Sequence, residues 1–239
     1  MQQLSKPLVC GYCGKHINGK RGVTWEMEHV ISDCLYPLTR SQKGVPSINR
    51  MTIPACPDCN DSWQKDEAHF KTVMMLAGEP NAAIKNGWPK SRRALQDERY
   101  GPANVHAIAR NMAKRVVQGE MRTCINPGED ERCWRVARKI VRGLAVYEEL
   151  FPFVTDDRVL STMREAIRLP APIEAMLAAL PPLNCGERDP SVFTYEYAIL
   201  NRDNIHSVWF FTIYQTRRFL GLLGIKPFVY RGGGQWDLK

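Results

Sequence analysis

Residues 10–13 read Cys10-Gly11-Tyr12-Cys13 and residues 56–59 read Cys56-Pro57-Asp58-Cys59, and these two pairs decide the fold. Each pair places two thiolates on one tight turn, and two such turns together complete the tetrahedral sulfur shell that zinc prefers. A four-sulfur site has no open coordination position, so the sequence predicts a structural zinc ion that helps to fold a small module. Redox-active pairs are the alternative, but they require a βαβ context that the surrounding sequence lacks.

The segment around the two pairs is rich in turns and has few apolar runs. Leu8-Val9 and the run from Val23 to Ile31 are separated by residues 18–22, Asn-Gly-Lys-Arg-Gly, which is typical of a hairpin connection. A helix is expected to begin near Asn60 and to continue to Met75. The predicted order is therefore strand, strand, helix.

Between the cysteine pairs lies Trp25-Glu26-Met27-Glu28-His29-Val30-Ile31, and Asn60 directly follows the second pair. In this order, the pieces resemble the HNH, or ββα-metal, nucleases, in the branch that includes phage junction-resolving endonucleases and many bacterial HNH proteins. The resemblance covers roughly residues 8–75. It implies a zinc-stabilised ββα-metal module and a metal-dependent endonuclease that hydrolyses DNA phosphodiester bonds.

The resemblance also implies a role for each matching residue. Cys10, Cys13, Cys56 and Cys59 would hold the structural zinc. Glu28, where the family more often has aspartate, and Asn60 would bind a catalytic divalent metal, Mg²⁺ or Mn²⁺, and His29 would be the general base. These residue types suit the chemistry, because hydrolysis needs a base to deprotonate water and oxygen ligands suit a hard cation.

One position departs from the family pattern. The family usually has an asparagine five residues before the second cysteine pair, where it orients the general base, but this chain has Met51. Asn49 lies two residues earlier and is a candidate substitute. Because of this departure, a zinc module that binds nucleic acid without cutting it stays open as an alternative function.

Several other polar residues have no motif around them. His16, Lys65, His69 and Lys71 are expected to be ordinary surface or helix residues rather than ligands of a metal or a phosphate. Four cysteines lack ligand spacing and are predicted to be ordinary buried or free thiols: Cys34, Cys124, Cys133 and Cys185.

The chain is long enough for a second, larger unit. Residues 78–101 contain several glycines, prolines and charges, which indicates a linker, so the predicted domains are 1–78, the HNH module, and 79–239, a mixed α+β domain. Helical spacing of apolar residues predicts helices over 102–116, 132–144 and 173–180. The runs Val192–Leu200 and Ile205–Tyr214 predict an antiparallel hairpin joined by residues 201–204. The fold class is therefore α+β.

The charge of the chain favours a polyanionic partner. Its net charge is +8, and residues 85–142 contain fourteen Lys and Arg against six Asp and Glu. On the predicted helix over 132–144, a basic stripe repeats at three- and four-residue steps, and it is either a solvated face or a nucleic-acid-binding surface: Arg132, Arg135, Lys139 and Arg142. DNA is the expected partner, and a nuclease subunit of a bacterial antiviral defence complex, with a protein partner, is a further alternative.

The first seven residues lack the apolar core of a signal peptide, and no later segment has the roughly 20 consecutive apolar residues of a membrane span. The sequence therefore predicts a cytoplasmic protein without a membrane partner.

Overall fold

A computed structural model describes residues 8–22, 24–36, 50–77, 80–117, 119–127, 130–163, 175, 177–180, 183–202, 204–232 and 235–238. The fold is mixed α+β, as the sequence predicts, and its largest sheet is five-stranded and antiparallel. Among the described residues no helix is both long and apolar enough to cross a membrane.

The N-terminal part has the order strand, strand, helix, but its second strand is not the predicted one. Strand β1 (Glu26–His29) pairs antiparallel with β2 (Thr52–Ala55) rather than with the run at Leu8-Val9. Val9 instead forms an isolated bridge with His16. After β2 come the short helix α1 (Pro57–Asp61) and α2 (Gln64–Leu76), so the predicted helix over 60–75 exists but begins earlier and is interrupted. A single 3₁₀ turn, η1 (Asp33–Leu35), lies between the strands.

The predicted linker over 78–101 is wrong, because most of it is helix α3 (Ala82–Leu95). Asn81 caps this helix, since its side-chain oxygen accepts a hydrogen bond from the Ile84 amide at 2.9 Å. Pro89 lies inside the helix and lacks an amide donor, and burial of Ala83, Ile84, Gly87 and Ser91 helps to offset its cost.

The predicted helix over 102–116 is only half right. Helix α4 (Gly101–Ala109) ends early, and the chain continues as β3 (Met112–Val117), which pairs with β4 (Glu120–Ile125). Gly119, between the two strands, has φ +83°, which favours glycine and permits the tight turn. The turn and the cross-strand pairing therefore override the helical spacing of Met112 and Val116.

The C-terminal part begins with helix α5 (Glu131–Tyr147) and the 3₁₀ turn η3 (Asp156–Arg158). The five-stranded sheet has the order β5-β9-β8-β7-β6, and its members are β5 (Val159–Met163), β6 (Asn184–Asp189), β7 (Phe193–Arg202), β8 (Ile205–Ile213) and β9 (Arg217–Gly224). The predicted β7–β8 hairpin and the predicted helix over 132–144 are both confirmed. A final hairpin joins β10 (Phe228–Gly232) to β11 (Gln235–Leu238). Of the predicted helix over 173–180, residues 175 and 177–180 are described, and residues 175, 177 and 178 are helical.

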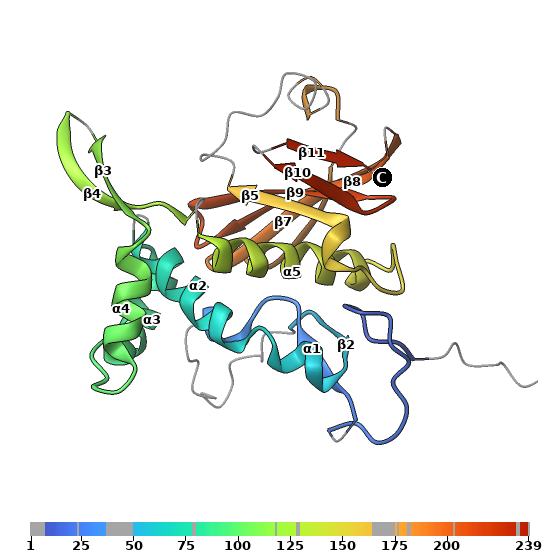
Figure 1. The fold of residues 1–239 in the computed structure, drawn as a ribbon, viewed down its shortest axis with the longest axis horizontal. Coiled ribbons are helices and arrows are strands. Elements are labelled where there is room, and N and C mark those ends of the chain that lie inside the picture. Colours follow the sequence, from blue (N-terminus) through green and yellow to red (C-terminus); the bar gives the residue numbers. More distant parts are fainter. Residues whose placement is uncertain are drawn as a thin grey trace, which may run out of the picture.

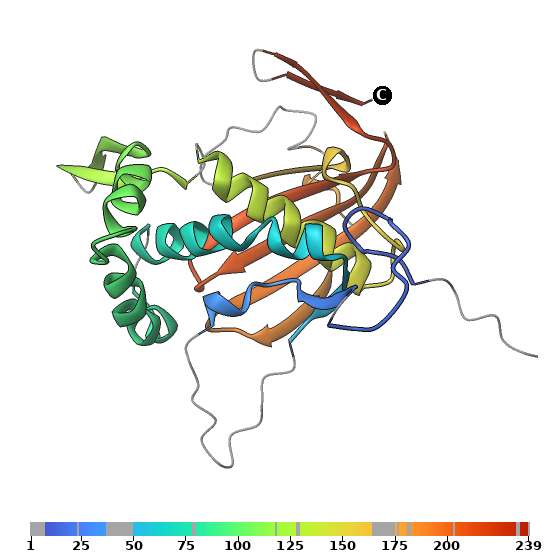
Figure 2. The same cartoon turned by 60° about the horizontal axis from the view of Figure 1, so that its bottom comes forward.

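Helix α5 lies between the sheet and the elements of the N-terminal part (Figures 1 and 2). Glycines permit close packing on both of its sides. A Cβ atom at Gly143 would lie 2.9 Å from Val30, and one at Gly221 of β9 would lie 2.4 Å from Val141. One hydrophobic core therefore extends from Cys10 to Leu223, across the predicted domain boundary at 78–79.

Candidate metal centre and active site

The four cysteines of the two pairs form one cluster. Their sulfur atoms all lie within 4.8 Å of one another, and the sulfurs of Cys13 and Cys56 are 3.8 Å apart. Two ligands of a tetrahedral zinc with Zn–S bonds of about 2.3 Å lie about 3.8 Å apart, so the donor set and its spacing fit this metal.

Local backbone structure holds the two turns together. The Gly11 amide donates to the Pro54 carbonyl of β2 at 2.8 Å, which fixes the first turn against the strand that leads into the second. Gly14 has φ +73° and its amide donates to the Cys10 carbonyl at 2.9 Å, which closes the first turn. Cys56 is the N-cap residue of α1, so the second turn is the start of a helix.

The thiols of the cluster also influence each other's protonation. A hydrogen bond from Cys59 lowers the pKa of Cys10 to about 4, against the opposing effect of burial. The same bond, together with burial, raises the pKa of Cys59.

Glu28 lies in a buried charge cluster rather than beside Asn60. The ammonium of Lys139 donates to the carboxylates of both Glu28 and Glu67 and, at 3.0 Å, to the carbonyl of His29. The side chain of Lys139 is fully buried, and those of Glu28 and Glu67 are only 12% and 11% exposed. We call these three residues the Lys139 cluster.

The pKa values of Glu28 and Lys139 are both raised, but for different reasons. Burial raises the pKa of Glu28, although the charge of Lys139 opposes this effect. Burial alone lowers the pKa of Lys139, but Tyr12, Glu67 and Glu28 raise it above its ordinary value. Lys139 therefore stays protonated and supplies the positive charge that balances one of the two carboxylates.

Asn60 contacts a different carboxylate of the same strand. Its side-chain amide donates to Glu26 at 3.2 Å, and Glu26 shares one face of β1 with Glu28 because side chains two residues apart in a strand point the same way. Glu26 was missed from the sequence, and this two-residue alternation is the signal that could have found it. His29, at the end of β1, is half-buried and lies opposite Thr52.

The predicted ligand pair for a divalent cation does not fit this arrangement. The carboxylate of Glu28 is engaged by Lys139, and the side-chain nitrogen of Asn60 donates to Glu26. Within the described part of the chain, the His, Cys, Asp and Glu groups placed to share a metal ion do not include Glu28 or His29. The structure therefore does not support a catalytic Mg²⁺ or Mn²⁺ on Glu28 and Asn60.

The residue at the unusual family position has a packing role. Met51 is buried, and its carbonyl accepts a hydrogen bond from the Val30 amide at 2.9 Å. Its side chain belongs to the core and offers no polar group for orienting His29. Asn49, the candidate substitute, lies outside the described residues.

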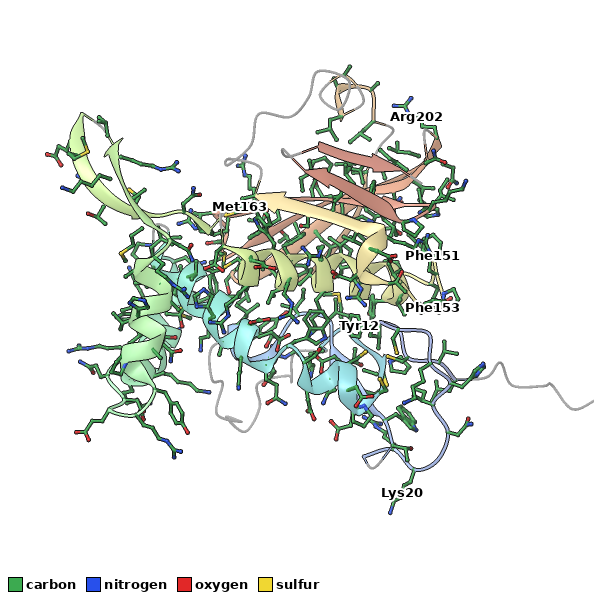
Figure 3. The ribbon with its side chains drawn as sticks, viewed as in Figure 1. Tyr12, Lys20, Phe151, Phe153, Met163 and Arg202 are labelled. Carbon is green, nitrogen blue, oxygen red and sulfur yellow. The ribbon has the colours of Figure 1, made fainter. Side chains whose placement is uncertain are left out.

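The predicted basic stripe is corrected for two of its four members. Lys139 and Arg142 are buried, and Arg142 donates to the carbonyls of Tyr12 at 2.6 Å and Val154 at 2.8 Å. Tyr12 belongs to the first cysteine turn and lies next to Arg142 of α5 (Figure 3). These two basic side chains therefore face the N-terminal part rather than solvent.

The other two members of the stripe are partly exposed but form ion pairs. Arg132 and Arg135 bind the two carboxylate oxygens of Asp66 at 2.8 and 2.6 Å. Arg135 also lies over the ring of Trp63. The stripe thus joins α5 to α2, and its pattern arises from contacts inside the molecule.

The residues without a motif fall into two groups. His16, Lys65 and Cys185 are exposed, Cys34 and Cys124 are half-buried, and Lys71 is buried. His69 and Cys133 are buried near Asp130, where the nitrogen of His69 lies 2.6 Å from a carboxylate oxygen of Asp130. No local pattern points to this second group, because His69 and Cys133 belong to different helices.

Comparison of the chain with protein-family models, with curated proteins and with solved structures finds no match.

Proposed function

We propose that the protein is a phosphodiester hydrolase of the HNH type that acts on DNA, with His29 as its general base. One observation carries the proposal: the four-cysteine cluster, the β1–β2 pair and helix α1 occur together, with Glu28 and His29 at the end of β1 and Asn60 directly after Cys59. In this proposal Cys10, Cys13, Cys56 and Cys59 bind a structural zinc ion, which has no vacant position for substrate.

The proposed reaction is an in-line attack of water on phosphorus. His29 accepts a proton from the water as the new P–O bond forms, the bond from phosphorus to the 3′ oxygen breaks, and that oxygen leaves as a hydroxyl after it takes up a proton. The products carry a 5′-phosphate and a 3′-hydroxyl. No step is assigned to a divalent ion, because Lys139 already occupies the carboxylate of Glu28.

The Lys139 cluster supports this site electrostatically. Two carboxylates without a cation would repel an approaching phosphate, and Lys139 reduces their summed charge from −2 to −1. Lys139 also donates to the carbonyl of His29, which fixes the backbone that carries the base. Buried charge clusters of this kind occur more often at functional sites than elsewhere.

The surface that supports DNA binding is the region of α3, α4 and the β3–β4 hairpin. Residues 82–125 contain nine Lys and Arg against three Asp and Glu. The hairpin extends away from the body of the molecule (Figure 1), and Lys114, Arg115 and Arg122 on it are exposed. A two-stranded ribbon of this kind is narrow enough to enter the DNA major groove.

We expect the double variant Lys114→Ala/Arg115→Ala to bind duplex DNA more weakly. Each lost phosphate contact should reduce the slope of log affinity against log salt by about 1, so the slope should fall by about 2. Fluorescence anisotropy with a labelled duplex across a salt series measures this change. The matched control is Arg202→Ala/Arg218→Ala, which removes the same charge from exposed positions on the large sheet, where Arg202 lies on the other side of the molecule (Figure 3). Equal slopes in the two variants would exclude the hairpin as the contact surface.

Two contacts favour a second candidate function, a zinc module that binds nucleic acid without cutting it. Lys139 neutralises the charge of Glu28, and the side-chain amide of Asn60 donates a hydrogen bond to Glu26. The first contact occupies a carboxylate that a catalytic cation would use, and the second holds the Asn60 side chain beside Glu26.

The variant His29→Ala distinguishes the two candidates. If His29 is the base, nicking of supercoiled plasmid should fall by about 10² to 10⁴ while DNA binding is unchanged. The assay is run with Mg²⁺, with Mn²⁺ and with a chelator. The control is His16→Ala, because His16 is an exposed histidine with no role in the proposed reaction. Wild-type protein that binds plasmid but nicks it under none of these conditions would instead establish the second candidate.

A further inference from the structure

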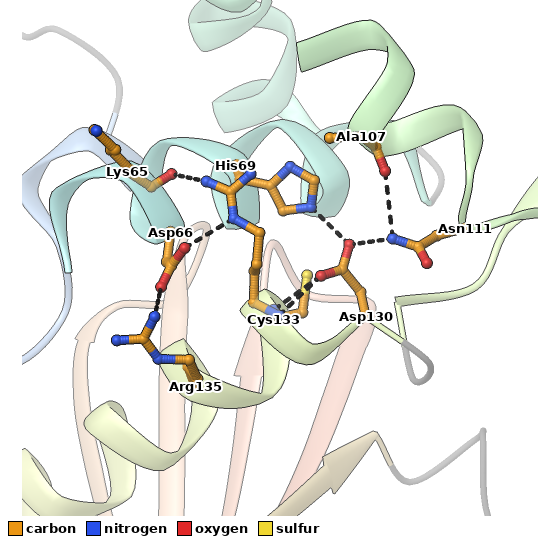
Figure 4. Close-up of polar contacts among 9 residues, drawn as sticks. Lys65, Asp66, His69, Ala107, Asn111, Asp130, Cys133 and Arg135 are labelled. Carbon is orange, nitrogen blue, oxygen red and sulfur yellow. Dashed lines mark hydrogen bonds and ion pairs between the residues drawn. The ribbon is translucent and has the colours of Figure 1, made fainter. Parts of the chain in front are cut away.

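A second group of metal-binding side chains lies where α2, the end of α4 and the start of α5 meet (Figure 4). His69 comes from α2, Asp130 is the N-cap residue of α5, and Cys133 lies in the first turn of α5. One ligand atom from each of the three lies within 4.8 Å of the others, and all three residues are buried. This group is separate from the four-cysteine cluster and from the Lys139 cluster.

The carboxylate of Asp130 is fixed by four donors. Its Oδ1 atom accepts from the backbone amides of Arg132 at 3.0 Å and Cys133 at 3.3 Å. Its Oδ2 atom lies 2.6 Å from both His69 Nε2 and the side-chain amide of Asn111. Asn111 therefore acts as an outer partner that orients the carboxylate, as the neighbours of metal ligands commonly do.

The spacing of Asp130 and Cys133 directs both side chains to one place. An N-cap residue and the residue three positions later lie on the same side of the first helical turn. His69 faces this turn from α2, and the sulfur of Cys133 lies beside the imidazole in Figure 4. Imidazole nitrogen, thiolate sulfur and carboxylate oxygen together form a donor set that zinc accepts.

We propose that His69, Asp130 and Cys133 bind a second zinc ion, which joins α2 to the start of α5. A thiolate and a carboxylate together carry a charge of −2, which Zn²⁺ neutralises in a buried place. On binding, Cys133 releases its proton to solvent, and His69 gives up its Nε2 proton and keeps one on Nδ1. His69 Nε2 and Asp130 Oδ2 then exchange their hydrogen bond for bonds to the metal. With zinc bonds of about 2.0 to 2.1 Å, those two atoms would lie about 3.3 Å apart. Their present separation of 2.6 Å therefore has to increase by less than about 1 Å, which small side-chain rotations can supply.

Zinc stoichiometry of the purified full-length chain tests this proposal. We expect two zinc ions per chain in the wild type and one in Cys133→Ser, in His69→Gln and in Asp130→Asn. Serine and asparagine are close in size to the residues they replace, and asparagine is as good an N-cap as aspartate. Cys185→Ser is the matched control and should retain two ions, because Cys185 is an exposed thiol outside both clusters.

Cobalt substitution gives a second measurement, which reports thiolate ligands of the metal directly. The wild type would have five thiolate ligands, four in the cysteine cluster and one from Cys133. The intensity of the sulfur-to-cobalt charge-transfer band should therefore fall by about one fifth in Cys133→Ser. A wild type with one zinc ion or none, or a Cys133→Ser protein that still binds two, would overturn the proposal. Loss of the four-cysteine zinc is distinguishable, because Cys13→Ser should leave the His69 site able to bind one ion.

Discussion

The variant Cys56→Ser is expected to lose the N-terminal zinc ion and much of the stability of the N-terminal part. The free energy of zinc binding to four-ligand peptides is on the order of 10 kcal/mol and is coupled to folding, so loss of one thiolate should remove a large share of it. Cys56 is buried in the core that β2 and α1 share with α5. Loosening of this site should therefore expose part of that core.

The position of Cys56 excludes a weakened helix start as the cause of any loss of stability. It is the N-cap of α1, where serine is a better residue than cysteine, so a fall in stability cannot arise from a weaker helix start. Thermal unfolding followed by circular dichroism, together with zinc content, measures the effect. The control Cys185→Ser removes an exposed thiol and should unfold like the wild type. If Cys56→Ser kept both the zinc content and the melting temperature of the wild type, the structural zinc site would be disproved.

The variant Lys139→Met should be destabilised by about 3 to 5 kcal/mol, the usual result of removing one partner from a buried ion pair. Methionine has a similar length to lysine, so the core keeps its packing, but Glu28 and Glu67 lose the cation that lies between them. Chemical denaturation at neutral pH gives the change in the free energy of unfolding.

The pH dependence of Lys139→Met provides a second check. Burial already raises the pKa of Glu28 against the effect of Lys139, and loss of that lysine raises this pKa further. The folded variant then binds a proton more tightly than the unfolded chain does, so its stability should fall as the pH rises through the folded pKa. The deficit relative to the wild type should therefore shrink as the pH is lowered.

A triple variant separates charge from packing. Glu28→Gln/Glu67→Gln/Lys139→Met replaces all three charges with neutral groups of similar size, and replacement of a whole buried ion cluster is often neutral or stabilising. It should recover most of the stability that Lys139→Met loses. If the triple variant were as unstable as the single one, packing of the lysine side chain rather than its charge would explain the loss.

Features that depend on neighbouring residues were predicted well. The two Cys-x-x-Cys turns come together as expected, because each turn is closed locally and each cysteine pair has the other pair as its partner. The β7–β8 hairpin and α5 follow from alternation and from helical spacing. Helix α3 was missed because glycines and prolines in residues 78–101 indicate a linker, whereas the Asn81 cap and burial of Ile84 stabilise a helix there.

Strand pairing and charge pairing were predicted less well. The partner of β1 is β2, a run of only four residues whose strand pattern is too short to stand out in the sequence. The group formed by His69, Asp130 and Cys133 is likewise invisible in the sequence, because His69 and Asp130 are 61 residues apart. Such contacts depend on how α2 and α5 pack, and local spacing carries no information about that packing.

By itself, the sequence determined the cysteine cluster, the α+β class and the helical face on which Lys139 and Arg142 lie together. Only the tertiary structure decided what that face contacts. A helical repeat fixes which side chains point the same way, but α5 has the sheet on one side and the N-terminal part on the other. Lys139 therefore meets Glu28 and Glu67, from 111 and 72 residues away, because a buried charge is stable only where the fold brings it an opposite one.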